Sequence, residues 1–519
     1  MSGAEALRRY HAPVWDEPII MEMGREGERG IIVPRVEEEI RRAVGEAESH
    51  IPAKMRRKNP PKIPELSQPQ VLRHYLRLSQ QTLGMEFDID IGVGTCTMKY
   101  SPKVNEELAG KIAEIHPLQD EDTIQGILEI VYRFGHVFLK EISGMDEFSF
   151  QPGGGSAAAH NNACMIRKYH EVNGELKQRN EIITTIFSHP CDAACPATAG
   201  FKLVTLYPDE ETGLPSTEAL KAAVSENTAG LFITNPEDTG IFNPEIDEWT
   251  KIVHEAGGLC SYDQANANAI LGITRAREAG FDMCFFNLHK TFSSPHGSSG
   301  PACGAVCVTE ELASFLPVPV VVYDGERYRL DYDRPHSIGR VRGFLGNVQV
   351  VLRSYAWAMS MGAEGLREVA EVSMINNNYL EKKLLEVPGV TKPYGTERRV
   401  DQIRYSLEKL KRETGLGIED VNRRVVDFGI QSFFTSHHPW IVPEPFTPEP
   451  CETYSKADID YWAQVLHHVC EEAYSNPEIL KTAPHNSTVS RINSEPLDDP
   501  ERWAMTWRAY LRKRRGVRI

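Results

Sequence analysis

Between about residues 120 and 325 the sequence alternates helix-like and strand-like segments, and this alternation limits the possible folds more than any other feature. Short apolar runs indicate buried strands, and the longer amphipathic segments between them indicate helices. Such alternation is typical of an α/β sheet with helices on its faces. The expected strands are 147–151, 181–187, 202–206, 230–234 and 259–262, and the expected helices are 123–144, 157–173, 218–225 and 248–256.

The regions on either side of this core have a different character. Residues 1–65 are charged and punctuated by proline, and we expect them to form an N-terminal arm with a helix at 36–49. A helical segment at 68–81 leads into a large domain, taken as residues 66–350. A long helix from 354 to 386 then leads into a smaller C-terminal α+β domain, taken with that helix as residues 351–519.

Composition excludes several classes of function. The 519 residues carry 57 Lys and Arg against 73 Asp and Glu, and the resulting net charge of -16 argues against nucleic acid or an anionic membrane as a partner. We found no apolar run of membrane-spanning length and no signal-peptide pattern, so we expect a cytoplasmic protein. The ten cysteines include the pairs Cys191/Cys195 and Cys303/Cys307. No partner pair stands at zinc spacing, so we expect no metal site.

Lys290 follows a short apolar segment that reads as a buried strand. Lysine is seldom buried unless it is paired or chemically used, and an amine in an apolar pocket is a competent nucleophile toward a carbonyl. By itself, such a lysine is more often a strand-edge residue that reaches water. His289 beside it is a candidate for contact with a cofactor, or a packed and hydrogen-bonded histidine.

Two further motifs precede this lysine. The segment 151–159 is rich in glycine and lies between an expected strand and an expected helix, so the backbone at Gly155, Ser156 and Ala157 is a candidate anion site. Asp263 ends an expected strand, where a side chain points into the crevice that binds ligands in open α/β sheets. An aspartate there is equally suited to cap a helix.

The order of these motifs indicates pyridoxal 5'-phosphate as the cofactor. A glycine-rich loop takes the phosphate, a carboxylate pairs with the protonated pyridine nitrogen, and a lysine bonds to the aldehyde carbon. Lys290 follows Asp263 by 27 residues, in the required order. Ala265 and Asn287 flank these two positions, and we expect them to contact the cofactor as well.

Several longer blocks resemble the pyridoxal-phosphate subunit of the glycine cleavage system P-protein, which is subunit 2 of the two-subunit glycine dehydrogenase (decarboxylating). The resemblance covers about residues 17–507, and the blocks that carry it are 73–79, 94–103, 116–119, 262–266, 287–292, 337–344 and 449–453. It implies a type I aminotransferase fold with a mixed, mainly parallel sheet. It also implies decarboxylation of glycine, with transfer of the aminomethyl group to a lipoylated H-protein and with subunit 1 as a partner in an oligomer.

The resemblance also places further residues at the site. Thr97 and Lys99 lie in a family block and are expected near the substrate, while Arg340 and Arg342 are candidates to bind a substrate carboxylate. In the family a histidine stacks on the cofactor ring. An ungapped match places Asp192 at that position and leaves His189 three residues earlier, with Thr198 further along the same segment.

This chain departs from the family where the chemistry takes place. Besides Asp192, the polar residues of the first glycine loop are replaced in Gly154–Ala159, and the small domain lacks the His-Glu-Phe-Val motif near 400–405. Three hypotheses therefore stand. The chain decarboxylates glycine, or it is a paralogue that acts on another amino acid as a decarboxylase, aminotransferase or lyase, or it is a scaffold without activity.

Overall fold

The computed structural model describes residues 7–59, 61–84, 87–94, 96–97, 99–112, 115–116, 118–295, 302–395, 398–433 and 435–515. The chain divides into two compact units. The first comprises residues 1–8 and 84–483, and the second comprises residues 9–83 and 484–519.

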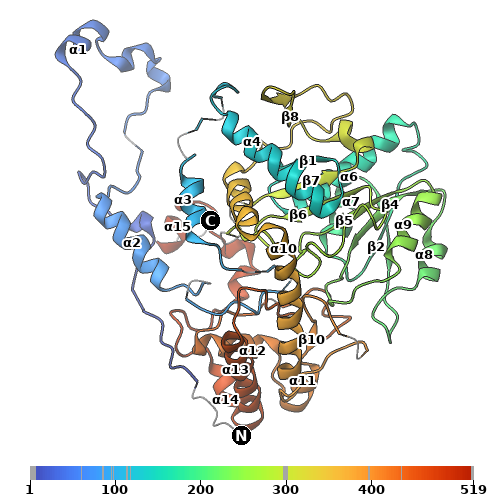
Figure 1. Ribbon diagram of the computed structural model, residues 1–519. Coiled ribbons are helices and arrows are strands. Elements are labelled where there is room, and N and C mark those ends of the chain that lie inside the picture. Colours follow the sequence, from blue (N-terminus) through green and yellow to red (C-terminus); the bar gives the residue numbers. More distant parts are fainter. Residues whose placement is uncertain are drawn as a thin grey trace. The chain divides into compact units, whose positions relative to one another are not determined.

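A seven-stranded sheet forms the centre of the first unit (Figure 1). Its spatial order is β1-β7-β6-β5-β4-β2-β3, and only β7 runs antiparallel to its neighbours. The sheet is therefore mixed and mainly parallel, as predicted. Its strands are β1 (Glu147–Ser149), β2 (Glu181–Thr185), β3 (Lys202–Leu206), β4 (Thr228–Thr234), β5 (Leu259–Asp263), β6 (Met283–Asn287) and β7 (Gly304–Val308).

Helices cover both faces of this sheet because its central strands are apolar on both sides. One face packs against α6 (Gly155–Val172) and α7 (Cys191–Thr198), through residues such as Phe232 and Phe285. The other face packs against α4 (Gln125–Arg133), α8 (Thr217–Ala223), α9 (Ile246–Glu255) and the first half of α10 (Val348–Leu384). Packing on both faces therefore fixes the positions of the strand ends.

The expected helix at 123–144 is interrupted. It comprises α4, a π-helical turn (η4, Phe134–Leu139) and α5 (Lys140–Ser143). Gly135 lies in the π-helical turn, where a Cβ atom would meet the ring of Phe148 at 2.9 Å. Close packing against β1 therefore accompanies the change of helical pitch, which apolar periodicity alone does not reveal. The helix expected at 36–49 is also shorter, since α1 spans only Glu38–Val44 and ends at Gly45.

A second core occupies the C-terminal part of the first unit. The end of α10 packs there with α11 (Glu408–Thr414), α12 (Ile418–Val425), α13 (Lys456–Ser475) and α14 (Pro477–Thr482). The strands β10 (Tyr405–Ser406) and β11 (Pro445–Phe446) pair antiparallel beside these helices. The remaining pair, β8 (Val320–Tyr323) and β9 (Tyr328–Asp331), is also antiparallel. Helix α3 (Lys103–Gly110) packs against α10.

The second unit contains α1, α2 (Gln68–Gln80) and α15 (Trp507–Arg514). Ser67 and Gln70 form a capping box that starts α2. The carboxylate of Glu17 accepts a hydrogen bond from Arg77 at 2.6 Å and lies 2.8 Å from His74 Nδ1, so it ties the chain before α1 to α2. None of the helices in the described ranges of either unit is long and apolar enough to cross a membrane.

Candidate active site

Asp263 and Lys290 stand at the ends of adjacent parallel strands. Asp263 is the last residue of β5, and Lys290 lies in the turn that follows β6. Both side chains are buried, with exposed fractions of 3% and 5%. The N–H of Ala265 donates to Asp263 Oδ1 at 2.8 Å, and the N–H of Lys290 donates to the Asn287 carbonyl at 3.0 Å. Hydrogen bonds donated by backbone N–H groups therefore hold the Asp263 side chain and the Lys290 turn in place.

One pocket brings four of the expected site residues together. His189, Asp263, Ala265 and Lys290 all line it. The other lining residues are Thr234, Pro236, Asp238, Asn266, Asp401 and Gln402. Burial raises the pKa of Asp263 to about 6, although the Ala265 N–H and the charge of Lys290 oppose the rise. At neutral pH Asp263 is therefore mainly a carboxylate, and it lines the same pocket as Lys290 at the carboxyl ends of the strands.

His189, rather than Asp192, reaches this pocket. His189 precedes α7, and the N–H of Cys191 donates to its Nδ1 at 3.1 Å. Burial lowers the pKa of His189 to about 4, so the ring is neutral at pH 7 and carries its proton on Nε2. Asp192 lies in the first turn of α7, is fully buried, and accepts a hydrogen bond from Thr234 Oγ1 at 2.9 Å.

The residues expected to bind an anion lie at the start of α6. Gly155, Ser156 and Ala157 make up its first turn, where backbone N–H groups have no partner within the helix. Asn287 packs against this turn: a Cβ atom at Gly155 would lie 2.7 Å and 2.8 Å from the two polar atoms of its amide. Asn287 is 6% exposed, and its Oδ1 has no hydrogen-bond partner within the described residues.

Lys99 contacts the lysine turn, and Thr97 contacts Glu449, which also accepts a hydrogen bond from a residue of the pocket. Lys99 Nζ donates to the carbonyl of Thr291 at 3.0 Å and pairs with Glu452 at 2.8 Å. Thr97 Oγ1 donates to Glu449 Oε2 at 2.7 Å. Asn266, which lines the pocket, also donates to Glu449, at 2.7 Å. These contacts connect the segment before α3 with the C-terminal segment around residue 450.

The remaining expected residues lie outside the pocket wall. Thr198 is exposed at the end of α7, where its hydroxyl donates to the Ala194 carbonyl at 2.8 Å. Arg340 is exposed and donates to the Tyr332 hydroxyl at 3.3 Å. Arg342 is exposed beside Gly153, at the glycine-rich loop. His289 is buried next to Lys290.

The sequence did not single out Asp238, Asp401 and Arg404. Burial opposes ionisation of Asp238, but a hydrogen bond from His437 and the charge of Arg404 lower its pKa to about 2. Burial and the charge of Glu449 raise the pKa of Asp401 well above its usual range. The sequence signal that could have pointed to Asp401 and Arg404 is the absence of the family motif at 400–405.

Two sets of side chains have the composition of a metal site. The ligand atoms of His189, Cys191 and Asp263 lie within 4.8 Å of one another, and so do those of His254, Cys260 and Asp282. Burial raises the pKa of both thiols well above the usual range. Since metals bind thiolates, neutral buried thiols make both sets poor ligands.

The pocket fits the chemistry that pyridoxal phosphate requires. Asp263 is a buried carboxylate with Cys191 Sγ 3.7 Å from its Oδ2, placed to face a protonated ring nitrogen. Lys290 supplies the amine, and the first turn of α6 supplies N–H donors for a phosphate. The buried Asn287 oxygen next to that turn has no hydrogen-bond partner among the described residues, as expected where a bound phosphate group would supply one.

Comparison with known proteins agrees with this geometry. Residues 154–407 match the family model of class-V aminotransferases, and residues 369–488 match that of the C-terminal domain of glycine dehydrogenase. A glycine decarboxylase (P-protein) in inhibitor-bound form superposes with a TM-score of 0.70 at 22% identity, covering 85% of this chain and all of that one. The predicted aminotransferase fold is therefore confirmed.

Curated relatives match over nearly the whole length. A probable glycine dehydrogenase (decarboxylating) subunit 2 from Pyrococcus abyssi is 45% identical over 505 residues, covering 96% of this chain and 98% of that protein. One from Aeropyrum pernix is 39% identical over 514 residues, covering 97% and 98%. With this identity over this length, the chain belongs to the family of glycine dehydrogenase (decarboxylating) subunit 2.

Proposed function

We propose that this chain binds pyridoxal phosphate and decarboxylates glycine. The observation that carries the proposal is the meeting of Lys290 and Asp263 in one buried pocket of a chain that is 45% identical to subunit 2 relatives. When bound, the cofactor supplies an electron-accepting ring that takes up the electron pair of the breaking bond between Cα and the carboxylate. The remaining chemistry falls to the protein.

Each pocket residue has a role that follows from its position. Lys290 would hold the cofactor, with its side-chain amine as the group that bonds to the aldehyde carbon. Asp263 keeps the ring nitrogen protonated, which increases the pull on the electron pair. His189 is neutral and offers its Nε2 proton as a hydrogen-bond donor inside the pocket. The walls formed by Thr234, Pro236 and Gln402 suit a small substrate.

The proposal includes partners. The printed names of the relatives call them subunit 2, so we infer a subunit 1 in the same assembly. By family resemblance, a lipoylated H-protein accepts the aminomethyl group. We place the assembly in the cytoplasm, where the ten free cysteines would stay reduced.

The first test is the visible absorption of the purified protein with added cofactor. We expect a band that shifts on titration with glycine and not with larger amino acids. Lys290→Ala should abolish the band, whereas Lys202→Ala, on the exposed edge strand β3, should preserve it. A response to another amino acid alone would support the repurposed paralogue. An unchanged spectrum in Lys290→Ala would support a scaffold.

The second test addresses the partners. Isotope-labelled bicarbonate should enter the carboxyl group of glycine only when subunit 1 and lipoylated H-protein are both present. Exchange that occurs at full rate without subunit 1 would remove that partner from the proposal.

A further inference from the structure

Arg342 holds its guanidinium group against the glycine-rich loop. A Cβ atom at Gly153 would collide with Arg342 Nη1, so the absence of a side chain at Gly153 is what lets the arginine lie there. Its charge also reaches Cys303, which precedes β7, and lowers the pKa of that thiol against a larger rise caused by burial. Arg342 thus contacts Gly153, which lies two residues before the first residue of α6.

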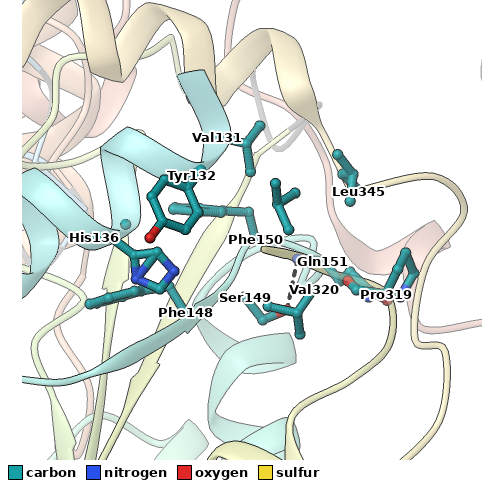
Figure 2. Close-up of a pocket in the computed structure, with 12 residues that line it drawn as sticks. Val131, Tyr132, His136, Phe148, Ser149, Phe150, Gln151, Pro319, Val320 and Leu345 are labelled. Atoms are coloured by element: carbon teal, nitrogen blue, oxygen red, sulfur yellow. Dashed lines mark hydrogen bonds between the residues drawn. The ribbon is translucent and has the colours of Figure 1, made fainter. Parts of the chain in front are cut away.

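The loop that carries Arg342 is anchored by Gln151, the residue that ends the chain segment leading to this glycine-rich loop. Gln151 Oε1 accepts a hydrogen bond from the N–H of Val341 at 3.2 Å. Its Nε2 donates to the carbonyls of Pro317 and Pro319 at 3.3 Å and 3.1 Å. Figure 2 shows Gln151 between Phe150 and Pro319 at the edge of an apolar cavity. Because Gln151 is 1% exposed and both ends of its side-chain amide are hydrogen-bonded, it fixes the backbone next to Arg342.

The guanidinium of Arg342 is available to a ligand as far as the described part of the chain shows. Within the described residues it makes no ion pair or hydrogen bond, whereas Arg340 donates to the Tyr332 hydroxyl and lies 5.6 Å from the centroid of its ring. The neighbouring turn of α6 offers N–H donors and the positive end of an 18-residue helix. Asn287, 94% buried and with an amide oxygen that has no hydrogen-bond partner among the described residues, packs against this turn at Gly155.

From these contacts we propose that Arg342 binds the phosphate group of the cofactor at the start of α6. The inference rests on the proposed function, since it takes pyridoxal phosphate as the ligand. A planar guanidinium suits the oxygens of a phosphate, and a charged hydrogen bond is about twice as strong as a neutral one. The role differs from that of a substrate-carboxylate ligand, which the sequence suggested for both arginines.

The test compares two ligands that differ only in the phosphate. Dissociation constants for pyridoxal phosphate and for unphosphorylated pyridoxal are measured by absorbance and fluorescence titration of the full chain. Arg342→Gln should weaken pyridoxal phosphate binding about tenfold or more and leave pyridoxal binding unchanged. Arg342→Lys should fall between, because lysine keeps the charge without the planar fork. Arg340→Gln is the matched control and should bind both ligands as the unaltered chain does.

Other outcomes overturn the inference in distinguishable ways. Equal weakening of both ligands would mean that Arg342 shapes the loop without contacting the phosphate. If cofactor binding were unchanged but the spectral shift needed a higher glycine concentration, Arg342 would instead bind the substrate carboxylate. If the unaltered chain bound neither ligand, the proposed function would fail together with the inference. Thermal unfolding of each variant verifies that the exposed substitution leaves the fold intact.

Discussion

Arg404 donates a hydrogen bond to Asp238 in the interior of the protein, with Nη2 and Oδ2 3.3 Å apart. Asp238 follows β4 and lines the pocket, whereas Arg404 directly precedes β10 in the C-terminal part of the first unit. His437 Nδ1 lies 3.3 Å from the same carboxylate oxygen, and its ring meets that of His189 edge-on at 5.5 Å. The ion pair therefore joins two distant chain segments at the wall of the site.

Replacing Arg404 alone should strongly destabilise the protein. Arg404→Met leaves the Asp238 carboxylate buried without its guanidinium, and breaking a buried pair in this way costs about 3–5 kcal/mol. Adding Asp238→Asn should restore most of the loss, since the uncompensated charge is then absent. The measurement is the midpoint of urea unfolding, monitored by far-UV circular dichroism.

The matched control for this pair is Arg423→Met. Arg423 pairs with Glu419 on the exposed side of α12, and such surface pairs contribute about 0–1 kcal/mol. If Arg404→Met shifted the midpoint no more than Arg423→Met does, the buried pair would not stabilise the fold.

The residues that were predictable from the sequence are those fixed by local pattern. Asp263 and Lys290 follow directly after apolar strands, and strands of one parallel sheet end at the same edge. The glycine-rich loop was recognisable for the same reason, since Gly155 starts a helix after a short loop that follows strand β1. Strand–loop–helix order was therefore enough to predict an α/β sheet and to group Asp263 and Lys290, whereas the aminotransferase fold was implied by the family resemblance.

The rest of the pocket depends on contacts that no local pattern encodes. Asp238 and Arg404 are 166 residues apart, and their pairing arises only when the C-terminal segment folds against the strand ends. Whether His189 or Asp192 reaches the pocket depends on where α7 begins. This helix has eight residues and contains Pro196, and it was not predicted from the sequence. Because the helix starts at Cys191, Asp192 turns into the core and His189 remains at the pocket.

Asp263 should make the cofactor-free protein less stable at neutral pH. Burial raises its pKa to about 6 from an ordinary value near 4, so its favourable contribution is fully present below about pH 4 and is lost as the pH rises through about 6. Asp263→Asn removes this cost and should stabilise the cofactor-free protein by about 2–3 kcal/mol at pH 7. The gain should shrink toward pH 4, and cofactor affinity should fall. Urea unfolding of both proteins at a series of pH values measures the gain in the free energy of unfolding. A gain that is independent of pH would contradict this account.

Gly155→Ala should weaken cofactor binding by distorting the first turn of α6. The added Cβ atom would lie 2.7 Å and 2.8 Å from the amide atoms of Asn287, which is closer than packed atoms tolerate. The side chain of Asn287 must then shift. Because the backbone carbonyl of the same residue accepts a hydrogen bond from the N–H of Lys290, we expect the phosphate site and the lysine turn to be disturbed together. We expect the dissociation constants for pyridoxal phosphate and pyridoxal both to rise, by about tenfold, a loss of about 1.4 kcal/mol of binding free energy.

Gly110→Ala is the matched control for Gly155→Ala. Nothing in the described structure lies within 4 Å of a Cβ atom at Gly110, so cofactor affinity should not change. Affinity in Gly155→Ala equal to that of the control would show that the contact with Asn287 does not shape the site.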